Sequence, residues 1–411
     1  MVGTWPAATA AAAFPGNAVA GLARRDSTRD PDDVMAWLRL ACAPGVGPVA
    51  ARLLLAAFGL PQQVLAQSVE ALSAVVPKKQ ARAVLAAPGA ALSALAARTL
   101  AWLDTPGNHL VTLADDAYPA RLFDLPDPPP LLYIKGDPAL LARPAVAIVG
   151  ARGATTQGKR NAQAFGRALS DAGLAVVSGL AQGVDAAAHA GGLLGRGGTV
   201  AVTGTGADIV YPRENLALAH QVAERGAIVT EFPLGMRGLA CNFPRRNRII
   251  AALARGVLVV EAAARSGSLI TARLAAELGR DVFAIPGSIH APLSKGCHLL
   301  IGQGAKLVEC PQDVLEEVGL PAPAPHGGAS VPTAAPTPAT TPTGQPGQPD
   351  FSDFADTSDP LLAALGYDPV TLDALCERSG QPPEAAAARL LELELAGHAE
   401  RLPGNLFRRL G

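Results

Sequence analysis

The chain has 411 residues, of which 49% are hydrophobic and 17% charged, and its formal net charge is −1. This composition is typical of a globular protein with a large core, and it excludes a protein whose whole surface is basic. The five cysteines show no CxxC or CxxH spacing, so neither a zinc site nor a disulfide framework is indicated, which fits a reducing cytoplasm. No apolar run approaches the ~18 residues of a membrane span, so no membrane contact is expected.

Changes in composition along the chain predict five segments. Residues 1–30 are rich in alanine and predict a disordered extension, whereas residues 31–105 have the apolar periodicity of a helical domain. Residues 106–318 alternate strand, glycine turn and helix, which predicts a Rossmann-type domain. Residues 319–358 are mostly Pro, Ala, Thr and Gly and predict a disordered linker, and residues 359–411 predict a winged helix.

The N-terminal helical segment contains a glycine hairpin. Apolar residues repeat at helical spacing from Val34 to Ala41, residues 44–50 then read Pro-Gly-Val-Gly-Pro-Val-Ala, and a second apolar helix follows. The arrangement resembles a helix-hairpin-helix (SAM-like) domain, in which the hairpin amides bind a DNA phosphate without reading the sequence. Because Gly-x-Gly also simply permits a tight turn and few basic residues lie nearby, packing or self-association is the favoured role.

From residue 145 onward, short β-branched runs alternate with helical stretches. The predicted strands are Ala145–Val149, Ala175–Val177, Thr199–Val202, Ile228–Thr230, Val257–Val260, Val282–Ile285 and Lys306–Val308. This alternation predicts an α/β fold, with an extended, doubly wound parallel sheet of Rossmann type. A further strand, Leu131–Ile134, is expected at a sheet edge. Ligands of such sheets bind beyond the carboxyl ends of the strands.

The most informative stretch covers residues 232–270. Arg245, Arg246 and Arg248 cluster at the start of a predicted helix, and the next strand is followed by Ser266-Gly267-Ser268 and another helix. A strand, a Ser/Gly turn and a helix N-terminus make an anion site, because free N–H groups and the helix dipole point at one place. We interpret the stretch as a phosphate-backbone binder. The alternative is that the arginines lie on a solvated helix face.

Two nucleotide-binding motifs are incomplete. Residues 153–160 nearly match the P-loop pattern GxxxxGK[ST], but Arg160 replaces the hydroxyl residue that would hold Mg²⁺. The dinucleotide fingerprint GxGxxG is absent from the turn after the strand that ends at Val149. Neither nucleotide hydrolysis nor use of NAD is therefore expected.

Asp185 and His189 lie four residues apart, on one face of a predicted helix. They could form a catalytic pair, but a polar pair that fixes the turn of residues 178–185 is the favoured interpretation. No further His, Cys or paired carboxylate completes a nucleophile or metal set in the sequence. The chain is therefore not expected to be an enzyme.

The predicted winged helix is acidic. Residues 359–411 carry eight acidic and five basic groups. The third predicted helix, which reads DNA in many winged helices, has Glu384, Glu392 and Glu394 against Arg389 alone. Protein contact or autoregulation is therefore favoured over duplex reading, and a purely structural adaptor acting through this segment is one alternative for the whole protein.

Six motifs stand in one order along the chain: Val146–Arg152, Ser178–His189, Tyr211–Asn215, Phe243–Ile250, Arg265–Thr271 and Arg280–Gly287. In these motifs, residues 110–310 resemble the DNA-processing protein A family, also called DprA or Smf. The resemblance implies a cytoplasmic bacterial protein that binds single-stranded DNA during natural transformation, protects it and loads a RecA-type recombinase on it. It also implies a homodimer through the Rossmann domain, with neither a metal nor a nucleotide cofactor.

The resemblance and the turn residues together predict a DNA-binding set: Arg152, Ser178, Gly179, Gly183, Asn215, Phe243, Arg245, Arg246, Asn247, Arg248, Ser266 and Gly267. Backbone amides and arginines bind phosphates with little sequence preference, so affinity is expected to be mainly electrostatic and to fall with salt. Phe243 offers one stacking face for a base. Because one protomer has few contacts, dimers or clusters along the strand are expected to raise the apparent affinity.

An enzyme on the same fold is the main alternative. The predicted sheet also resembles that of nucleotide phosphoribohydrolases, in which a glutamate beside a glycine-rich helix start is catalytic. Glu261, next to residues 265–268, could have that role. The PGGxGT turn of those enzymes is missing, because Ser266-Gly267-Ser268 stands in its place, so the binding protein is favoured.

Overall fold

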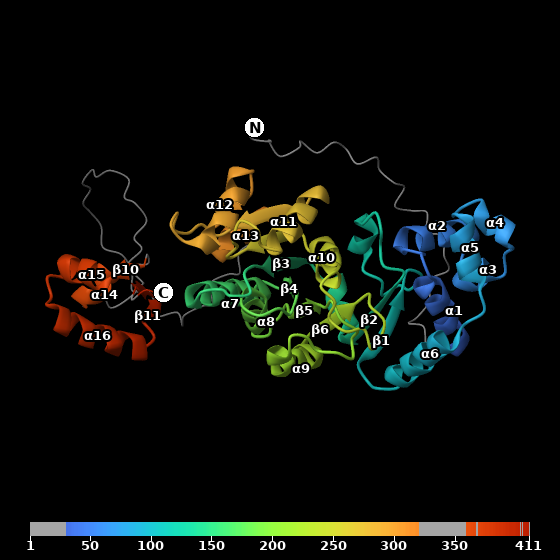
Figure 1. Cartoon of the computed structure of the whole chain (residues 1–411), viewed down its shortest axis with the longest axis horizontal. Helices are drawn as coiled ribbons and strands as arrows, with labels where there is room; N and C mark the ends of the chain where they lie inside the picture. The colour runs from blue at the N-terminus through green and yellow to red at the C-terminus, as the bar shows by residue number, and fades with distance from the viewer. Residues whose placement is uncertain (1–29, 320–358, 367–368, 403, 405, 411) are drawn as a thin grey trace, which may run out of the picture. The chain divides into compact units, whose positions relative to one another are not determined.

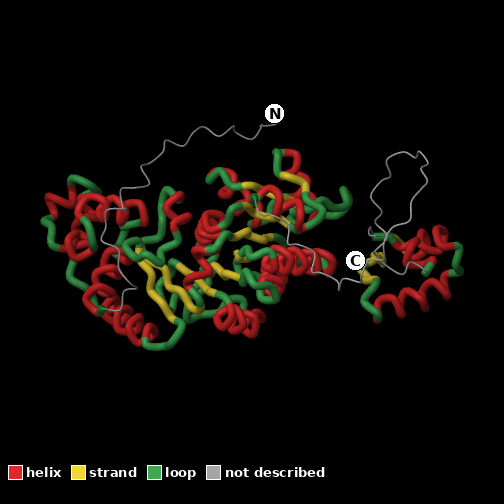
Figure 2. Tube along the Cα trace, turned by 180° about the vertical axis from the view of Figure 1, so that it is seen from behind, coloured by secondary structure: helices red, strands yellow, loops and turns green. Residues whose placement is uncertain are grey.

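A computed structural model of the chain describes residues 30–319, 359–366, 369–402, 404 and 406–410. The chain divides into two compact units, one within residues 1–322 and one within residues 323–411 (Figures 1 and 2). The N-terminal helices and the sheet share the first unit, and the finer division into five segments stays a prediction. Apart from residues 30 and 319, the predicted extension and linker lie outside the described residues.

Six helices precede the sheet: α1 (Pro31–Cys42), α2 (Pro48–Phe58), α3 (Pro61–Leu65), α4 (Val69–Ser73), α5 (Lys78–Leu85) and α6 (Ala90–Leu103). Asp30 caps α1, because its carboxylate accepts hydrogen bonds from the backbone N–H groups of Asp32 and Asp33. Gly45, at φ +76°, makes the turn of the predicted hairpin between α1 and α2. No single described helix is long and apolar enough to cross a membrane; only α5 and α6 taken together, bent by 60°, pass on length and composition.

Nine strands form one sheet in the order β1-β2-β6-β5-β4-β3-β7-β8-β9. Their bounds are β1 (Asn108–Thr112), β2 (Leu131–Gly136), β3 (Ala145–Val149), β4 (Ala175–Ser178), β5 (Thr199–Val202), β6 (Ala227–Thr230), β7 (Gly256–Val259), β8 (Asp281–Ala284) and β9 (Lys306–Leu307). Strands β3 to β9 are parallel. The Rossmann-type fold is confirmed, and its seven predicted strands agree with the structure to within one residue at each end.

The predicted edge position of residues 131–134 is wrong. Strand β2 lies between β6 and β1 and pairs with both in antiparallel register. The outer strand β1 is not predicted, because its five residues begin with Asn and His and are too few to show an apolar period. With β1 outside it, β2 can bury Tyr133 completely.

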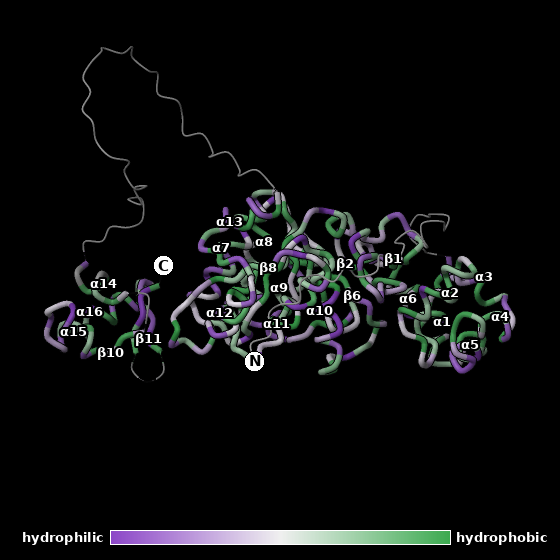
Figure 3. Tube along the Cα trace, turned by 90° about the horizontal axis from the view of Figure 1, so that it is seen from above, coloured by the Kyte–Doolittle hydropathy of each residue, from purple (hydrophilic) through white to green (hydrophobic). Residues whose placement is uncertain are grey.

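Helices cover both faces of the sheet (Figure 1). Helices α7 (Thr156–Asp171), α8 (Val184–Gly192), α9 (Leu216–Arg225) and α13 (Pro311–Glu317) lie on one face, and α10 (Asn242–Leu253) and α11 (Ser268–Glu277) lie on the other, with α12 (Lys295–Gly302) beside β8. Alternate residues of β3 belong to the two layers: Val146 and Ile148 to the core under α7 and α8, and Ala147 and Val149 to the core under α10 and α11. Figure 3 colours the trace by hydropathy and shows hydrophobic stretches, in green, along helices and strands of this unit.

The chain order creates a switch point in the middle of the sheet. From β3 the chain builds β4, β5 and β6 on one side, then returns to build β7, β8 and β9 on the other. The connections that leave β3 and β7 therefore diverge, and a crevice forms at their carboxyl ends. Four short 3₁₀ helices, η1 (Ala120–Asp124), η2 (Pro138–Ala142), η3 (Arg213–Asn215) and η4 (Pro292–Ser294), lie in the connections.

The second unit is a winged helix, as the sequence predicts. It contains α14 (Pro360–Leu365), β10 (Val370–Thr371), α15 (Leu372–Ser379), α16 (Pro383–Leu395), β11 (Ala399–Leu402) and β12 (Leu406–Arg409). The strands form a sheet in the order β10-β12-β11. Arg389, the basic residue of α16, pairs with Asp359 at 2.7 Å and with Glu392 at 2.5 Å, so α16 offers no unpaired cation.

Candidate nucleic-acid interface

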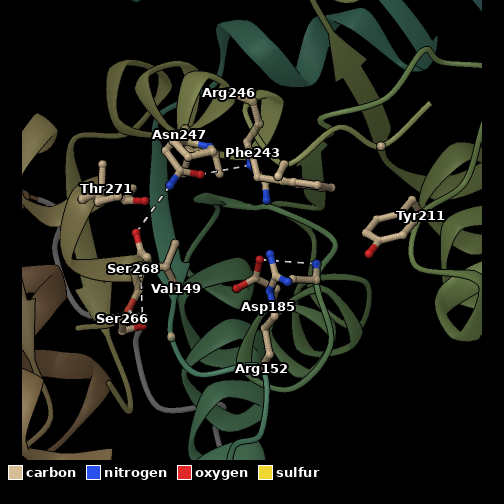
Figure 4. Close-up of a pocket in the computed structure, with 18 residues that line it drawn as sticks. Val149, Arg152, Asp185, Tyr211, Phe243, Arg246, Asn247, Ser266, Ser268 and Thr271 are labelled. Carbon is tan, nitrogen blue, oxygen red and sulfur yellow. Dashed lines mark hydrogen bonds between the residues drawn. The ribbon is translucent and has the colours of Figure 1, made fainter. Parts of the chain in front are cut away.

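A cavity of about 520 Å³ opens at the switch point, between the carboxyl ends of β3 and β7 and the start of α10 (Figure 4). We call it the first chamber. A second chamber of about 490 Å³ adjoins it. The two chambers, which together we call the cleft, share these lining residues: Arg152, Ala181, Tyr211, Phe243 and Arg246.

Seven of the twelve predicted DNA-binding residues line the cleft: Arg152, Gly179, Phe243, Arg246, Asn247, Ser266 and Gly267. The other five do not line either chamber: Ser178, Gly183, Asn215, Arg245 and Arg248. The role of all twelve in binding stays a prediction. Their contacts show why the sequence places them near one another.

The turn after β4 is held by two buried side chains. The Asp185 carboxylate accepts hydrogen bonds from the N–H groups of Gly179 and Ala181, at 3.1 and 3.4 Å. His189 Nε2 accepts the Leu180 N–H at 3.2 Å. The interpretation of Asp185 and His189 as a pair that fixes this turn is therefore confirmed. These three amides already have acceptors, so they are not free to bind an anion, contrary to what the sequence suggests for this turn.

The charge states of this buried pair follow from their contacts. Because His189 Nε2 is an acceptor, the ring carries its proton on Nδ1, which donates to the Thr199 hydroxyl at 2.7 Å. Burial, together with the nearby Arg246 charge, lowers the pKa of His189 to about 3, so the ring stays neutral. Burial raises the pKa of Asp185 above its ordinary value, against the attraction of Arg246 and the two amide hydrogen bonds.

Ser178, Gly183 and Asn215 shape the same turn from outside the cleft. The Ser178 hydroxyl donates to the Ile148 carbonyl at 2.6 Å. Gly183 has φ +77°, and a Cβ there would lie 2.3 Å from the Ala151 carbonyl oxygen, so only glycine fits. The Asn215 amide donates to the Leu180 carbonyl at 2.9 Å, which ties the segment that carries Tyr211 to the turn.

Arg246 is part of the cleft floor. It is 5% exposed, and its Nη1 donates to the carbonyl oxygens of Gly179, at 2.6 Å, and Val202. Burial lowers the pKa of Arg246 to about 10, against the attraction of Asp185. The guanidinium therefore remains charged at neutral pH, and it gives the floor of the cleft a positive potential while its donors bind the protein's own carbonyls.

Arg248 and Arg245 meet one carboxylate on the far side of α10. Arg248 is 7% exposed, and its Nη2 lies 2.6 Å from the Glu231 carboxylate. Its Nη1 donates to the Asp127 carbonyl at 2.7 Å. Arg245, whose side chain is 49% exposed, pairs with the same Glu231 oxygen at 3.0 Å. These two arginines thus hold α10 against the strand edge and the 127 loop.

Arg152 is an exposed cation that lines both chambers, whereas Arg213, also exposed, lines the second chamber alone. Arg152 follows β3 directly, and its guanidinium carbon lies 5.6 Å from the centre of the Phe243 ring. Within the described part of the chain, no carboxylate lies within ion-pair distance of it. A guanidinium that is exposed, unpaired and oriented by an aromatic ring is well suited to bind a phosphate.

The turn before α11 contributes hydroxyls and few free amides. The expectation of unsatisfied N–H groups fails at three amides of this turn, whereas the Gly267 N–H, at the first chamber, has no acceptor among the described residues. The N–H groups of Ser268, Leu269 and Ile270 donate back into the turn, to Ser266 Oγ, the Ser266 carbonyl and the Gly267 carbonyl. The hydroxyls of Ser266 and Ser268 lie 2.7 Å apart, and the Asn247 amide reaches the Gly267 carbonyl (Figure 4).

Glu261, the carboxylate that the enzyme alternative needs, is part of the framework. Its carboxylate accepts hydrogen bonds from the Thr155 backbone N–H at 2.9 Å and the Thr155 hydroxyl at 2.5 Å. Gly158 lets it come so close, because a Cβ there would lie 2.3 Å from the carboxyl carbon. The P-loop-like N-terminus of α7 is therefore filled by the protein's own carboxylate. Within the described residues, no group of three or more His, Cys, Asp or Glu could hold a metal ion.

The fold and the cleft define a Rossmann-type protein with a crevice lined by arginine and aromatic side chains at the switch point, and with a winged helix in the second unit. Residues 109–319 match the model of the family described as DNA recombination-mediator protein A, and residues 332–405 match that of the DprA winged helix domain. The chain belongs to this DprA/Smf family.

Three relatives show how far the similarity extends. Protein Smf of Escherichia coli is 41% identical over 311 residues, which cover 75% of this chain and 80% of Smf. The X-ray structure of DNA processing protein A from Streptococcus pneumoniae covers 68% of this chain and 95% of its own, with 39% identity and a TM-score of 0.59. A structure on the single-stranded DNA binding mode of DNA processing protein A from Helicobacter pylori covers 49% and 92%, with 31% identity and a TM-score of 0.46.

Proposed function

We propose that this protein binds single-stranded DNA in the cleft, protects it, and loads a RecA-type recombinase on it during natural transformation in the bacterial cytoplasm. The chain belongs to a family whose description is DNA recombination-mediator protein A, which supports the proposed loading of a recombinase. The cleft supports the first half. The observation that carries it is the exposed, unpaired Arg152 beside the aromatic side chains of Phe243 and Tyr211 at the switch point.

The contacts to DNA are side-chain contacts in this proposal. The amides of Gly179, Leu180, Ala181 and Ser268 already have acceptors, so we assign the phosphate contacts to Arg152 and to the hydroxyls of Ser266 and Ser268. The buried guanidinium of Arg246, in the floor of the cleft, adds a positive charge without contacting the phosphates. Because few cations are involved, binding weakens with salt along a shallow slope of about −0.7 per neutralised phosphate.

A titration of labelled oligo-dT by fluorescence anisotropy tests this proposal. The strand and a duplex of the same length are each titrated at several salt concentrations. We expect the single strand to bind more tightly than the duplex, with a log–log salt slope that corresponds to a few phosphates. A wild-type protein that ignores oligo-dT even in dilute buffer contradicts the proposal.

Recombinase loading has its own assay. Single-stranded DNA is first coated with a single-strand binding protein, and strand exchange by a RecA-type recombinase is measured with and without this protein. We expect the protein to shorten the lag before exchange and to slow nuclease digestion of the strand. Normal DNA binding without any effect on the lag would limit the function to binding and protection.

A homodimer is also part of the proposal. Strand β9 ends the sheet with only two residues, and Leu307 there is 44% exposed, while Leu299 on the neighbouring α12 is 47% exposed. An edge strand with exposed leucines is a surface that a second copy can cover. Sedimentation of the wild type against Leu299→Glu tests it; we expect a dimer for the wild type and a monomer for the variant.

The hydrolase alternative is not favoured by the geometry. The carboxylate that it needs, Glu261, caps α7 through Thr155 and lines neither chamber. A catalytic carboxylate has to reach the reacting atoms of a bound substrate. Direct measurement of base release from AMP or a cytokinin nucleotide is expected to show none, and a measurable rate would reverse this conclusion.

A further inference from the structure

The two aromatic side chains of the cleft differ in what covers them. Phe243 has the Arg152 guanidinium at 5.6 Å over its ring. Its edge packs against glycine backbone, since a Cβ at Gly204 would lie 3.0 Å from Phe243 Cδ1, and one at Gly238 3.3 Å from Cζ. Tyr211 is 46% exposed and lines both chambers. The ring that is open to a ligand is therefore Tyr211.

The ring geometry decides where a base can stack. The centroids of Tyr211 and Phe243 are 5.4 Å apart, and their planes are tilted by 39°. A base between two parallel rings needs them roughly 7 Å apart, twice a contact distance of ~3.5 Å. No base fits between these rings. A base can stack only on the outer face of Tyr211, which points away from Phe243.

The platform is held in place by the fold. Tyr211 precedes Pro212 and η3, and Asn215 of η3 donates to the carbonyls of Leu180 and Ala181 in the turn after β4. Figure 4 shows the Tyr211 ring across the pocket from Ser268 and Thr271. The second chamber, beside Tyr211, is also lined by Gln182 and Arg213, and its volume of about 490 Å³ is within the ~300–1,000 Å³ of small-molecule sites.

We propose that Tyr211 is the stacking platform for one unpaired nucleobase, which enters the second chamber while the adjoining phosphate lies against Arg152. The inference rests on the proposed DNA binding and says which residue makes it selective. Stacking needs a base face that is free of its neighbour and its partner strand, so the platform favours single over double strands. Any base has such a face, so this site does not select sequence.

The main test of the inference uses four proteins and two probes, and a 2-aminopurine strand and the variant Phe243→Leu complete it. The proteins are the wild type, Tyr211→Leu, Tyr211→Phe and a control, Leu216→Ala, which changes a neighbouring side chain that is 45% exposed and lines neither chamber. The probes are oligo-dT and an abasic oligomer with the same number of phosphates. Thermal unfolding of each variant checks that it is folded.

We expect Tyr211→Leu to weaken oligo-dT binding about tenfold, within the range for one stacked base, and to leave binding of the abasic oligomer unchanged. Tyr211→Phe and Leu216→Ala should match the wild type on both probes. A 2-aminopurine base in the strand should be quenched by the wild type and by Tyr211→Phe but not by Tyr211→Leu.

Three results would overturn the inference. In the first, Tyr211→Leu binds oligo-dT with the affinity of the wild type. In the second, Tyr211→Leu loses affinity for oligo-dT and for the abasic oligomer equally. In the third, Phe243→Leu, and not Tyr211→Leu, abolishes the preference for oligo-dT over the abasic oligomer. Each leaves the proposed function standing if the wild type still prefers single strands. Failure of the wild type to bind oligo-dT at all would overturn the proposed function itself.

Discussion

Helix α10 and the turn after β3 both contain arginine, but the arginines differ in burial and in their partners. The helix has three arginines within four residues, yet Arg246 and Arg248 are 5% and 7% exposed and donate to carbonyls and to Glu231. The turn has the single Arg152, which is exposed and oriented by Phe243. The dense run of arginines therefore belongs to the framework, while the isolated Arg152 stays unpaired and exposed at the cleft.

The comparison predicts that Arg248 matters most for stability. Replacing it by Ala leaves the Glu231 carboxylate buried with only Arg245 as partner, and breaking such a buried pair costs about 3–5 kcal/mol. Urea unfolding of Arg248→Ala should show a loss of this size. Arg273→Ala, which removes an exposed i,i+4 pair with Glu277, serves as control and should change stability by less than ~0.5 kcal/mol. Equal midpoints for both variants would show that Arg248 is not part of the framework.

Arg152 should matter most for DNA. We expect Arg152→Ala to lose one charge-assisted contact, about 1.5–3 kcal/mol of binding at low salt, and to reduce the salt slope by about 0.7. Its stability should stay near that of the wild type, because the side chain is exposed. Arg167→Ala, an exposed arginine of α7 paired with Asp171, is the matched control. An anisotropy titration in which both variants bind alike would remove Arg152 from the interface.

The buried His189 should make stability depend on pH. Its pKa in the folded protein, about 3, lies below the ordinary value of 6.5, so the unfolded chain takes up a proton first as the pH falls. The contribution of the neutral His189 to the free energy of unfolding is therefore fully present above pH 6.5. It is lost as the pH falls toward 3, at ~1.4 kcal/mol per pH unit. The unfolding free energies of the wild type and His189→Gln should therefore converge between about pH 6.5 and pH 5. A His189→Gln variant whose unfolding free energy runs parallel to that of the wild type over this range would show that folding does not lower the pKa of His189.

The smallest effect is expected from the winged helix. In helix α16 of this unit, Arg389 is paired with Asp359 and Glu392, while Glu384 and Glu394 are exposed. Removal of residues 320–411 should therefore change oligo-dT affinity by less than about twofold, or ~0.4 kcal/mol. Duplex binding should be equally unaffected in the same titration. A large loss of affinity would move the DNA contact, or part of it, to this unit.

The sequence by itself determined the class of fold and the place of the site. Strand and helix periods of residues 145–308 are local properties, and the order of strands, turns and helices implies a switch point. The six motifs indicate the family because each is a run of consecutive residues that can be recognised in the sequence itself. The winged helix also follows from local periodicity and turn residues. Among the described strands of the large sheet, β1 and the position of β2 escape this reasoning, because five residues carry too little pattern.

Tertiary structure alone decided which polar groups remain available. Several amides that look free in the turns after β4 and before α11 donate to Asp185, His189 and Ser266, and the Glu261 carboxylate caps the N-terminus of α7. Buried polar groups need partners, and those partners come from distant positions that no local pattern reveals. These contacts do not involve the side chains of Arg152 and Tyr211. The groups of the cleft that are available to a ligand are therefore those that the fold does not use for its own hydrogen bonds and ion pairs.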